Sequence, residues 1–332
     1  MLVSRRPTFH ETEAEALALE HYGLRASAHE LPSERDQNFK LVTERGGYLL
    51  KVFHPDEEAS VLDFQARALA LLSAPHFPRL VPTLAGEISV SVRRAGREHF
   101  LRMITFLPGM PFAKRATPSH DLLHAVGYAL GEMDGRLATF EHPAMDRVSQ
   151  WDSRRAPQTI RNNLGHIADP DDRALIAHFL AAFERRAAPL VPTLRRSVIH
   201  NDANDYNLLV DDDVVTGIID FGDMLRTYTV CELANACAYL MMGRPDPLGA
   251  ALEVAKGYHA AYPLGEEERS VLLDFIYLRL CLSVSISARQ QRQAPQDPYL
   301  SISERPAWAL LETLAEASLD RMEERVKGAF AL

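Results

Sequence analysis

A short stretch with β-strand character interrupts the otherwise helical pattern of the second part of the chain. It reads SVIHNDANDYNLLVDDDVVTGIIDFGD and predicts strands over 207–210 and 214–219, joined by a turn at 211–213. A loop rich in Asp and Asn comes directly before the first strand. So polar a loop among apolar strands has little structural reason to be there, and we therefore expect functional residues in it.

The first part of the chain has the opposite character, because strand signals dominate it. The segment KLVTERGGYLLKVF predicts a hairpin that turns at Gly46-Gly47, and two further strand candidates fill 86–107. A helix with one apolar face is predicted over 57–74. A Leu107-Pro108-Gly109 break follows, and a length of 332 residues suggests about two domains.

Asp202, Asn207 and Asp220 are the residues that carry the predicted chemistry. Asp202 and Asn207 lie at opposite ends of one turn, and Asp220 follows the strand predicted to pair with the strand after Asn207. Their side chains are therefore expected to converge. An Asp and an Asn can hold Mg²⁺ through oxygen while the other Asp accepts a hydroxyl proton, which is the division of labour that phosphoryl transfer requires.

Lys51 supplies the cation that such a reaction needs for the phosphates. It lies in GYLLKVF among apolar neighbours of a predicted strand, where a cation without a partner would be costly. Asp63 on the following helix is the best-placed acid to orient it, and Glu58 is a weaker substitute. Taken separately, Lys51 could be a strand lysine that reaches water, and the Asp and Asn residues could be turn formers. The presence of both motifs in one chain favours the phosphate role.

Composition limits the partners and the compartment. The formal net charge is −9, so no extended basic surface is expected to hold a nucleic acid. The most apolar late stretch, 275–289, contains Arg279 and is shorter than the roughly 20 residues that span a bilayer, so no membrane partner is expected. The three cysteines are odd in number, have no CxxC spacing and predict buried thiols of a reducing, cytoplasmic compartment.

Several blocks in their order resemble a known family, the kinase-like phosphotransferases that include aminoglycoside phosphotransferases, choline kinase and homoserine kinase. The blocks LPSERDQNF, YLLKVF, LDFQ, ITFLPGMP, HNDANDYNLLV and GIIDFGDM look like those of the hydroxylysine kinase group within that family. The resemblance covers nearly the whole chain. It implies an α+β, protein-kinase-like bilobal fold, with a β-rich nucleotide-binding lobe over 1–104 and a mostly α-helical catalytic and acceptor-binding lobe over 105–332.

The resemblance also implies roles for single residues. Asp202 would be the catalytic base, Asn207 and Asp220 would bind Mg²⁺, and Lys51, paired with Asp63, would bind the α- and β-phosphates of ATP or GTP. The turn at 34–39 would cover the phosphates, and the segment 105–107 would be the hinge that offers backbone groups to the purine. The residues concerned are Gln37, Asn38, Thr105, Phe106 and Leu107.

Three features depart from the family pattern. The phosphate loop is not rich in glycine, so cover of the phosphates is expected from backbone amides and from the side-chain amides of Gln37 and Asn38. Asn201 stands where the family commonly has a glycine between the His and the Asp. Asp63 is one methylene shorter than the usual Glu.

The acceptor is expected to be a small amino alcohol or hydroxylated amino acid, with hydroxylysine favoured. Acidic residues would suit an ammonium group and an arginine would suit a carboxylate; the candidates are Asp205, Asp223, Arg226 and Glu232. His200 is expected to hold the loop rather than to transfer protons. The alternatives are an aminoglycoside, homoserine, choline or ethanolamine kinase of the same fold, or a pseudoenzyme that binds nucleotide without turnover. The choice between ATP and GTP stays open.

Overall fold

The computed structural model describes residues 6–33, 35–293 and 304–330 of the chain. These residues form two compact units. Unit 1 comprises Met1–Gly109, His142–Ala144 and Thr216–Ile219, and unit 2 comprises Met110–Glu141, Met145–Val215 and Asp220–Leu332. The first unit extends past the boundary expected at residue 104, and it takes up two short segments that come later in the sequence.

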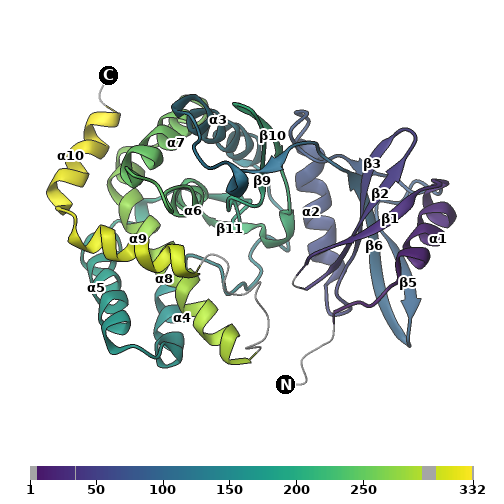
Figure 1. Cartoon of the computed structure of the whole chain (residues 1–332), viewed down its shortest axis with the longest axis horizontal. Helices are drawn as coiled ribbons and strands as arrows, with labels where there is room; N and C mark the ends of the chain where they lie inside the picture. Colours follow the sequence, from purple (N-terminus) through teal and green to yellow (C-terminus); the bar gives the residue numbers. More distant parts are fainter. Residues whose placement is uncertain (1–5, 34, 294–303, 331–332) are drawn as a thin grey trace. The chain divides into compact units, whose positions relative to one another are not determined.

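Unit 1 is built on an antiparallel sheet, coloured purple to blue in Figure 1. The strands follow the order β1-β2-β3-β6-β4, and β5 pairs with the first part of β6, residues 97–101. The elements are α1 (Glu11–Tyr22), β1 (Ser27–Leu31), β2 (Gln37–Thr43), β3 (Gly46–Val52), α2 (Ala59–Leu71), β4 (Leu80–Val81), β5 (Val90–Arg94) and β6 (Arg97–Thr105).

The two faces of this sheet differ because side chains alternate along each strand. One face carries the buried apolar side chains of the unit, among them Phe39, Leu50 and Met103, and packs against α1. Lys51 belongs to the other face, together with Arg102 opposite it in the register. Arg102 donates to the backbone carbonyl of Leu62 at 2.6 Å, which places α2 on the Lys51 face.

The predicted hairpin of β2 and β3 is confirmed, but its turn lies two residues earlier than expected. Thr43 pairs with Gly46, so Glu44 and Arg45 form the turn and the two glycines begin β3. Gly46 has a φ of 131°, which favours glycine. A Cβ atom on Gly47 would lie 3.1 Å from the Cβ of Phe106, so a larger residue there would crowd that side chain.

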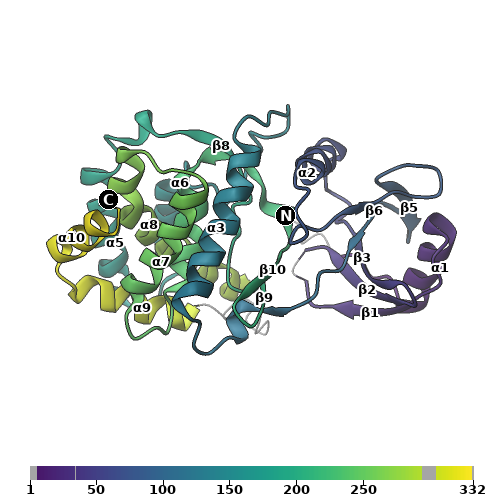
Figure 2. The ribbon, with the colours of Figure 1, turned by 90° about the horizontal axis from the view of Figure 1, so that it is seen from above.

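Unit 2 is mostly helical (Figure 2). The strands that follow β6 in the chain form two small sheets with the orders β10-β9-β7 and β11-β8. Its helices are α3 (His120–Leu137), α4 (Ala156–Asn163), α5 (Pro170–Arg186), α6 (Val230–Leu240), α7 (Pro247–Ala261), α8 (Glu266–Gln293), α9 (Glu304–Glu316) and α10 (Leu319–Ala329), with 3-10 turns η1 (Phe112–Lys114), η2 (Leu164–His166), η3 (Val191–Thr193) and η4 (Phe221–Asp223). Its strands are β7 (Met110–Pro111), β8 (Arg196–Ile199), β9 (Leu208–Asp211) and β11 (Leu225–Tyr228), together with the start of β10 (Val214–Ile218), whose residues from Thr216 onward belong to unit 1. A sheet-rich first part and a helical second part confirm the predicted α+β class.

Helices α3 and α7 approach each other closely through glycines. A Cβ atom on Gly127 would lie 1.8 Å from the carbonyl oxygen of Val254, and one on Gly257 would lie 1.9 Å from that of His124. Both distances are far shorter than a van der Waals contact. These positions therefore require glycine, and the two backbones pack directly against each other.

Helix α8 is the central helix of unit 2 and contacts α4, α5, α6, α9 and α10. The prediction that its apolar run is too short to span a bilayer was wrong, because the helix has 28 residues and is long and apolar enough by length and composition. However, 89% of its most apolar window is buried inside the protein. That burial is what the core helix of a folded domain shows, and length and composition alone are weak grounds for a membrane span.

Candidate active site

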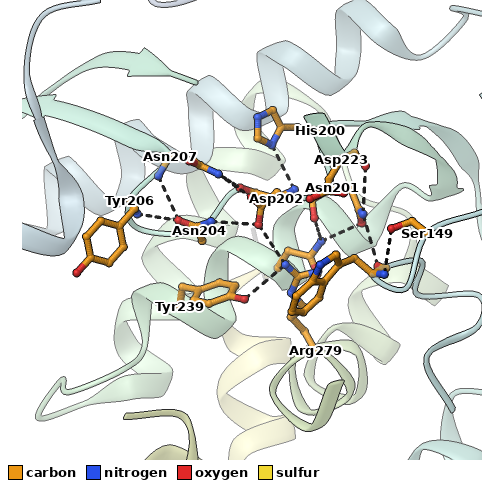
Figure 3. Close-up of polar contacts among 12 residues, drawn as sticks. Ser149, His200, Asn201, Asp202, Asn204, Tyr206, Asn207, Asp223, Tyr239 and Arg279 are labelled. Atoms are coloured by element: carbon orange, nitrogen blue, oxygen red, sulfur yellow. Dashed lines mark hydrogen bonds and ion pairs between the residues drawn. The ribbon is translucent and has the colours of Figure 1, made fainter. Parts of the chain in front are cut away.

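The polar loop predicted to carry function joins β8 to β9 and covers residues 200–207 (Figure 3). Its turn is held by Asn204, whose N–H donates to the Asp202 carbonyl at 2.8 Å and whose side-chain oxygen accepts the N–H of Tyr206 at 2.8 Å. The N–H of Asn207 completes the turn by donating to the Asn204 carbonyl at 3.0 Å. These local bonds are the reason that Asn and Asp recur in this sequence.

Asn201 adopts a left-handed backbone conformation with a φ of 67°, which explains why glycine or asparagine is suited to this position. Its backbone N–H donates to the Glu232 carboxylate at 2.9 Å, and its carbonyl accepts the side-chain amide of Asn235 at 3.1 Å. The buried ring of His200 packs edge-on against Phe221, with centroids 4.6 Å apart, and its Nδ1 accepts the N–H of Asp202 at 3.2 Å. These contacts indicate that His200 supports the loop.

Asp202 is the centre of this loop. Its two carboxylate oxygens accept the side-chain amides of Asn204, at 3.1 Å, and Asn207, at 2.7 Å. Burial and, after it, the negative charge of Asp223 raise the pKa of Asp202 to about 8, while Arg279 acts in the opposite direction. The side chain is still about a quarter exposed, so a hydroxyl group can reach it.

Asn207 and Asp220 offer a donor set that suits a hard divalent cation. The amide nitrogen of Asn207 donates to the Asp202 carboxylate and, at 2.9 Å, to the Asp202 carbonyl, which fixes the amide and reserves its oxygen for another partner. Asp220 has a left-handed φ of 61° and an exposed side chain, and its charge acts on Asp202. An amide oxygen and a carboxylate are ligands that Mg²⁺ accepts, with waters and phosphates completing the shell.

Lys51 is paired within unit 1, but with a different acid from the one predicted. Its Nζ lies 3.1 Å from Oδ2 of Asp36, and both side chains are largely buried. The other oxygen of Asp36 accepts the N–H of His54 at 2.9 Å. Asp36 was missed because it precedes β2 rather than following Lys51. Its place one residue before the paired strands, where Asn38 lies opposite Lys51, is the signal that could have found it.

The predicted pairing of Asp63 with Lys51 was therefore wrong. Asp63 is about half exposed on α2, where it pairs with Arg67 at 2.9 Å and with Nε2 of His142 at 3.0 Å, and these two contacts lower its pKa. Since Nδ1 of His142 accepts the N–H of Ala144, Nε2 carries the proton and donates to Asp63. Asp63 thus anchors the segment His142–Ala144 to α2. The substitute was also wrong, because Glu58 lies directly before α2 and contacts Ser60.

The prediction that the amide of Gln37 covers the phosphates was also wrong. The side chain is 2% exposed and bonds both to the N–H and to the carbonyl of Phe9, at 2.7 and 2.8 Å. The alternation along β2 puts Gln37 on the α1 face of the sheet, opposite to Lys51. Asn38 does lie on the Lys51 face, and its buried Oδ1 has no hydrogen-bond partner among the described residues. Glu34, which opens the predicted turn, lies outside the described residues.

The predicted hinge begins at Thr105, the last residue of β6. Thr105 donates its N–H to the carbonyl of Arg79 at 2.9 Å, and Phe106 donates its N–H to the carbonyl of Gly47 at 3.1 Å. Both N–H groups are therefore used within unit 1. Of the segment Thr105, Phe106 and Leu107, a purine could receive an N–H only from Leu107.

Two of the acceptor candidates are engaged elsewhere, and both predictions were wrong. Arg226 forms a bidentate ion pair with Asp146, with its Nε 3.1 Å from Oδ1. Its guanidinium is therefore not available to the carboxylate of an acceptor. Glu232 is fully buried, and its Oε2 accepts the backbone N–H of Asn201 at 2.9 Å. Burial raises the pKa of Glu232 to about 7. Glu232 thus supports the loop from α6 and cannot touch an acceptor.

Asp205 and Asp223 keep positions that an acceptor could use. Burial raises the pKa of Asp205 to about 6, and Arg244 acts against that rise. The charge of Asp223 acts on Asp202, and its backbone carbonyl accepts the side-chain amide of Asn201 at 3.3 Å. Asp205 is thus part of the loop that carries Asp202, and Asp223 lies close to that loop.

Arg279 on α8 was not predicted as a site residue. It is 3% exposed, and its Nη2 lies 3.4 Å from Oδ1 of Asp202 and 3.5 Å from the hydroxyl of Tyr239 (Figure 3). The guanidinium carbon lies 4.7 Å from the ring centroid of Trp151. An arginine inside a long apolar run was the available signal, because a buried charge calls for a partner.

Known proteins resemble the chain over most of its length. A model of the phosphotransferase enzyme family matches residues 27–268. The hydroxylysine kinase of Danio rerio is 31% identical over 342 residues, covering 96% of this chain and 95% of that protein. The hydroxylysine kinase of Mus musculus is 27% identical and covers 97% and 93%. A homoserine kinase of Zymomonas mobilis subsp. mobilis is 26% identical and covers 72% and 77%.

Solved structures share the fold at lower identity. A microcompartment-associated aminopropanol kinase has a TM-score of 0.71 and 21% identity, covering 95% of this chain and 99% of the other. An amicoumacin kinase, in complex with AMP-PNP, Ca²⁺ and its ligand, has a TM-score of 0.70 and 14% identity, with coverage of 92% and 94%. The family match, the full-length relatives and the shared fold agree, and the chain belongs to the phosphotransferase enzyme family as a small-molecule kinase.

Proposed function

We propose that this protein transfers the γ-phosphoryl group of ATP or GTP to the hydroxyl of a small hydroxylated amine or amino acid, with hydroxylysine the favoured acceptor. The observation that carries the proposal is the loop geometry, in which the Asp202 carboxylate accepts the Asn207 amide at 2.7 Å. This contact leaves the Asn207 oxygen for a metal and Asp202 for a hydroxyl. The 31% identity to a hydroxylysine kinase over 96% of the chain supports the acceptor.

In the proposed reaction Asp202 positions the acceptor and takes its proton. The acceptor oxygen forms a bond to the γ-phosphorus while the bond from that phosphorus to the β,γ-bridging oxygen breaks, and the nucleoside diphosphate leaves with that oxygen. The hydroxyl proton passes to the Asp202 carboxylate. Because Asn204 and Asn207 hold both carboxylate oxygens in place, the base is oriented before the acceptor binds.

Two sets of residues meet the charge on the phosphates in this proposal. Lys51, held by Asp36, would contact the α- and β-phosphates, and Asn207 and Asp220 would hold Mg²⁺. When bound, the cation supplies neutralisation of the charge that develops on the transferring group. The oxygen-only donor set supports Mg²⁺ over a softer metal such as Zn²⁺.

We also propose that the protein works in a reducing, cytoplasmic environment. Its three cysteines, Cys231, Cys237 and Cys281, are buried and free. Burial raises the pKa of each thiol, which suits an inert core role.

A screen that couples nucleoside diphosphate release to acceptor addition tests the function. The acceptors are hydroxylysine, homoserine, aminopropanol, choline, ethanolamine and an aminoglycoside, each with ATP or GTP and Mg²⁺. Turnover that depends on hydroxylysine supports the proposal. Turnover with only an aminoglycoside would overturn the proposed acceptor but leave the proposed mechanism in place. Nucleotide binding in a thermal-shift assay without turnover on any acceptor would make the protein a pseudoenzyme.

A further inference from the structure

A buried guanidinium next to the proposed base has more hydrogen-bond donors than the protein satisfies. Arg279 is 3% exposed, and its Nε and Nη1 have no hydrogen-bond partner among the described residues. Only Nη2 has partners, Asp202 and the Tyr239 hydroxyl, at the long distances of 3.4 and 3.5 Å. Leaving a buried donor unsatisfied costs about 1–3 kcal/mol, and more for a charged group. Such a group in a folded protein calls for a ligand that completes it.

Two aromatic rings flank this guanidinium. Its central carbon lies 4.7 Å from the ring centroid of Trp151 and 5.5 Å from that of Tyr239. Aromatic faces hold a guanidinium in one orientation while its N–H groups stay available in the plane of the group. Nε and Nη1 lie on different edges of the guanidinium, and each edge also includes Nη2, whose two contacts are long. A carboxylate can therefore bind across one edge, with one oxygen on Nη2 and the other on the unpartnered Nε or Nη1.

We propose that Arg279 binds the carboxylate of an amino-acid acceptor, with Trp151 and Tyr239 as the walls of this subsite. The inference rests on the proposed function and names the acceptor class more narrowly: a hydroxylated amino acid rather than an amino alcohol. Since Arg279 lies 3.4 Å from Asp202, an acceptor held there by its carboxylate lies next to the proposed base.

A carboxylate fits this position better than a phosphate of the nucleotide does. The proposal already gives the phosphates Lys51 and a metal held by Asn207 and Asp220. The rival arginine, Arg226, is occupied by Asp146. Two relatives of this chain, a hydroxylysine kinase and a homoserine kinase, are named for acceptors that carry a carboxylate.

Access to the subsite involves Trp151. Nε and Nη1 are closed to solvent in this structure, whereas Trp151, whose ring lies beside the guanidinium, is partly exposed. A carboxylate reaches the guanidinium edge when this indole turns aside. Binding of an amino-acid acceptor is therefore expected to change the surroundings of Trp151.

The test compares acceptors that differ only in the carboxylate. Hydroxylysine is paired with 1,5-diaminopentan-2-ol, and homoserine with 3-aminopropan-1-ol. We expect Arg279→Met to lower kcat/KM about 30-fold or more for the amino acids, mainly through KM, because a charged hydrogen-bonded contact is lost. We expect the decarboxylated acceptors to change much less, and Arg279→Lys to restore part of the loss.

Arg269→Met is the matched control. Arg269 lies ten residues earlier on the same helix, about 15 Å away along its axis, and its guanidinium lies over Phe330. This variant is expected to leave both acceptor classes unchanged. Equal losses on both classes in Arg279→Met would overturn the proposal, because they would place Arg279 in the service of the base or the phosphoryl group.

A second measurement needs no change at Arg279. The sequence has two tryptophans, so Trp308→Phe leaves Trp151 as the single fluorophore. Hydroxylysine is expected to shift or quench its emission, and 1,5-diaminopentan-2-ol to have no such effect. Emission that responds equally to both compounds, or to neither, contradicts carboxylate binding. Absence of turnover with every acceptor would overturn the proposed function, and this fluorescence response would still decide the role of Arg279.

Discussion

Two buried carboxylate and cation pairs, one in each unit, are built differently. In unit 1, Lys51 lies 3.1 Å from Asp36, whose other oxygen is held by the His54 N–H. In unit 2, Arg279 lies 3.4 Å from Asp202, and two of its nitrogens have no partner among the described residues. The first pair holds a cation in place by local structure. The second leaves N–H donors that a ligand could use. This difference is expected between a pair that positions a side chain and a pair that recognises a ligand.

The largest effect is expected at the carboxylate of the second pair. Asp202→Asn keeps the shape of the side chain but removes its ability to accept a proton, and a general base contributes typically about 10²–10⁴-fold. We expect kcat to fall by about 10³-fold while nucleotide still raises the thermal unfolding midpoint. A coupled assay of nucleoside diphosphate release and a thermal-shift assay measure the two quantities. An active Asp202→Asn protein would remove Asp202 from the role of base.

The first pair is tested by a contrast between two acids of unit 1. Asp36→Asn is expected to lower kcat/KM for the nucleotide by about 10-fold, because a charge-assisted contact to Lys51 is lost. Asp63→Asn is the matched control and is expected to change kcat/KM by less than about 3-fold, since surface ion pairs contribute little. Steady-state kinetics with varied nucleotide distinguish them. A larger loss in Asp63→Asn than in Asp36→Asn would favour Asp63 as the partner of Lys51, against the geometry of the structure.

The loop beneath the second pair depends on Glu232. Glu232→Ala leaves the backbone N–H of Asn201 without its buried acceptor, which is expected to cost about 2 kcal/mol of unfolding free energy. Denaturant unfolding measures the loss. Ser270→Ala, at an exposed position on α8, is the control and is expected to change stability by less than about 0.5 kcal/mol. Unchanged stability in Glu232→Ala would mean that the loop does not need this support.

The sequence was informative where the candidate residues lie at short spacing along one segment. Asp202, Asn207 and Asp220 lie within one short segment of strands and turns, and local turn chemistry explains why Asp and Asn recur in it. It was less informative where partners come from distant segments. Asp36 joins Lys51 through strand register, and Arg279 joins Asp202 through the packing of α8. The prediction for Gln37 failed because side chains alternate along a strand, so a shift of one residue moves a side chain to the other face of the sheet.

Helix α8 carries a third buried pair, which gives the smallest expected effect. Asp274 is 2% exposed and lies 3.3 Å from Nε of Arg186, and burial raises its pKa to about 6 despite that partner. A carboxyl whose pKa is raised by folding stabilises the protein only while it is protonated. The stability contributed by Asp274 is therefore lost as the pH rises from about 4 to about 6, and it stays lost above that range.

Asp274→Asn removes this titration while keeping the shape of the side chain. The unfolding free energy of the wild type minus that of Asp274→Asn is expected to fall by about 1–2 kcal/mol between about pH 4 and pH 7 and to be flat above pH 7. Denaturant melts of both proteins at each pH measure the difference, which cancels titrations that both proteins share. A difference that rises with pH would mean that Arg186 satisfies the Asp274 carboxylate. The pair on α8 would then belong with Lys51 and Asp36 as a completed contact, and Arg279 would be the exception on its own helix.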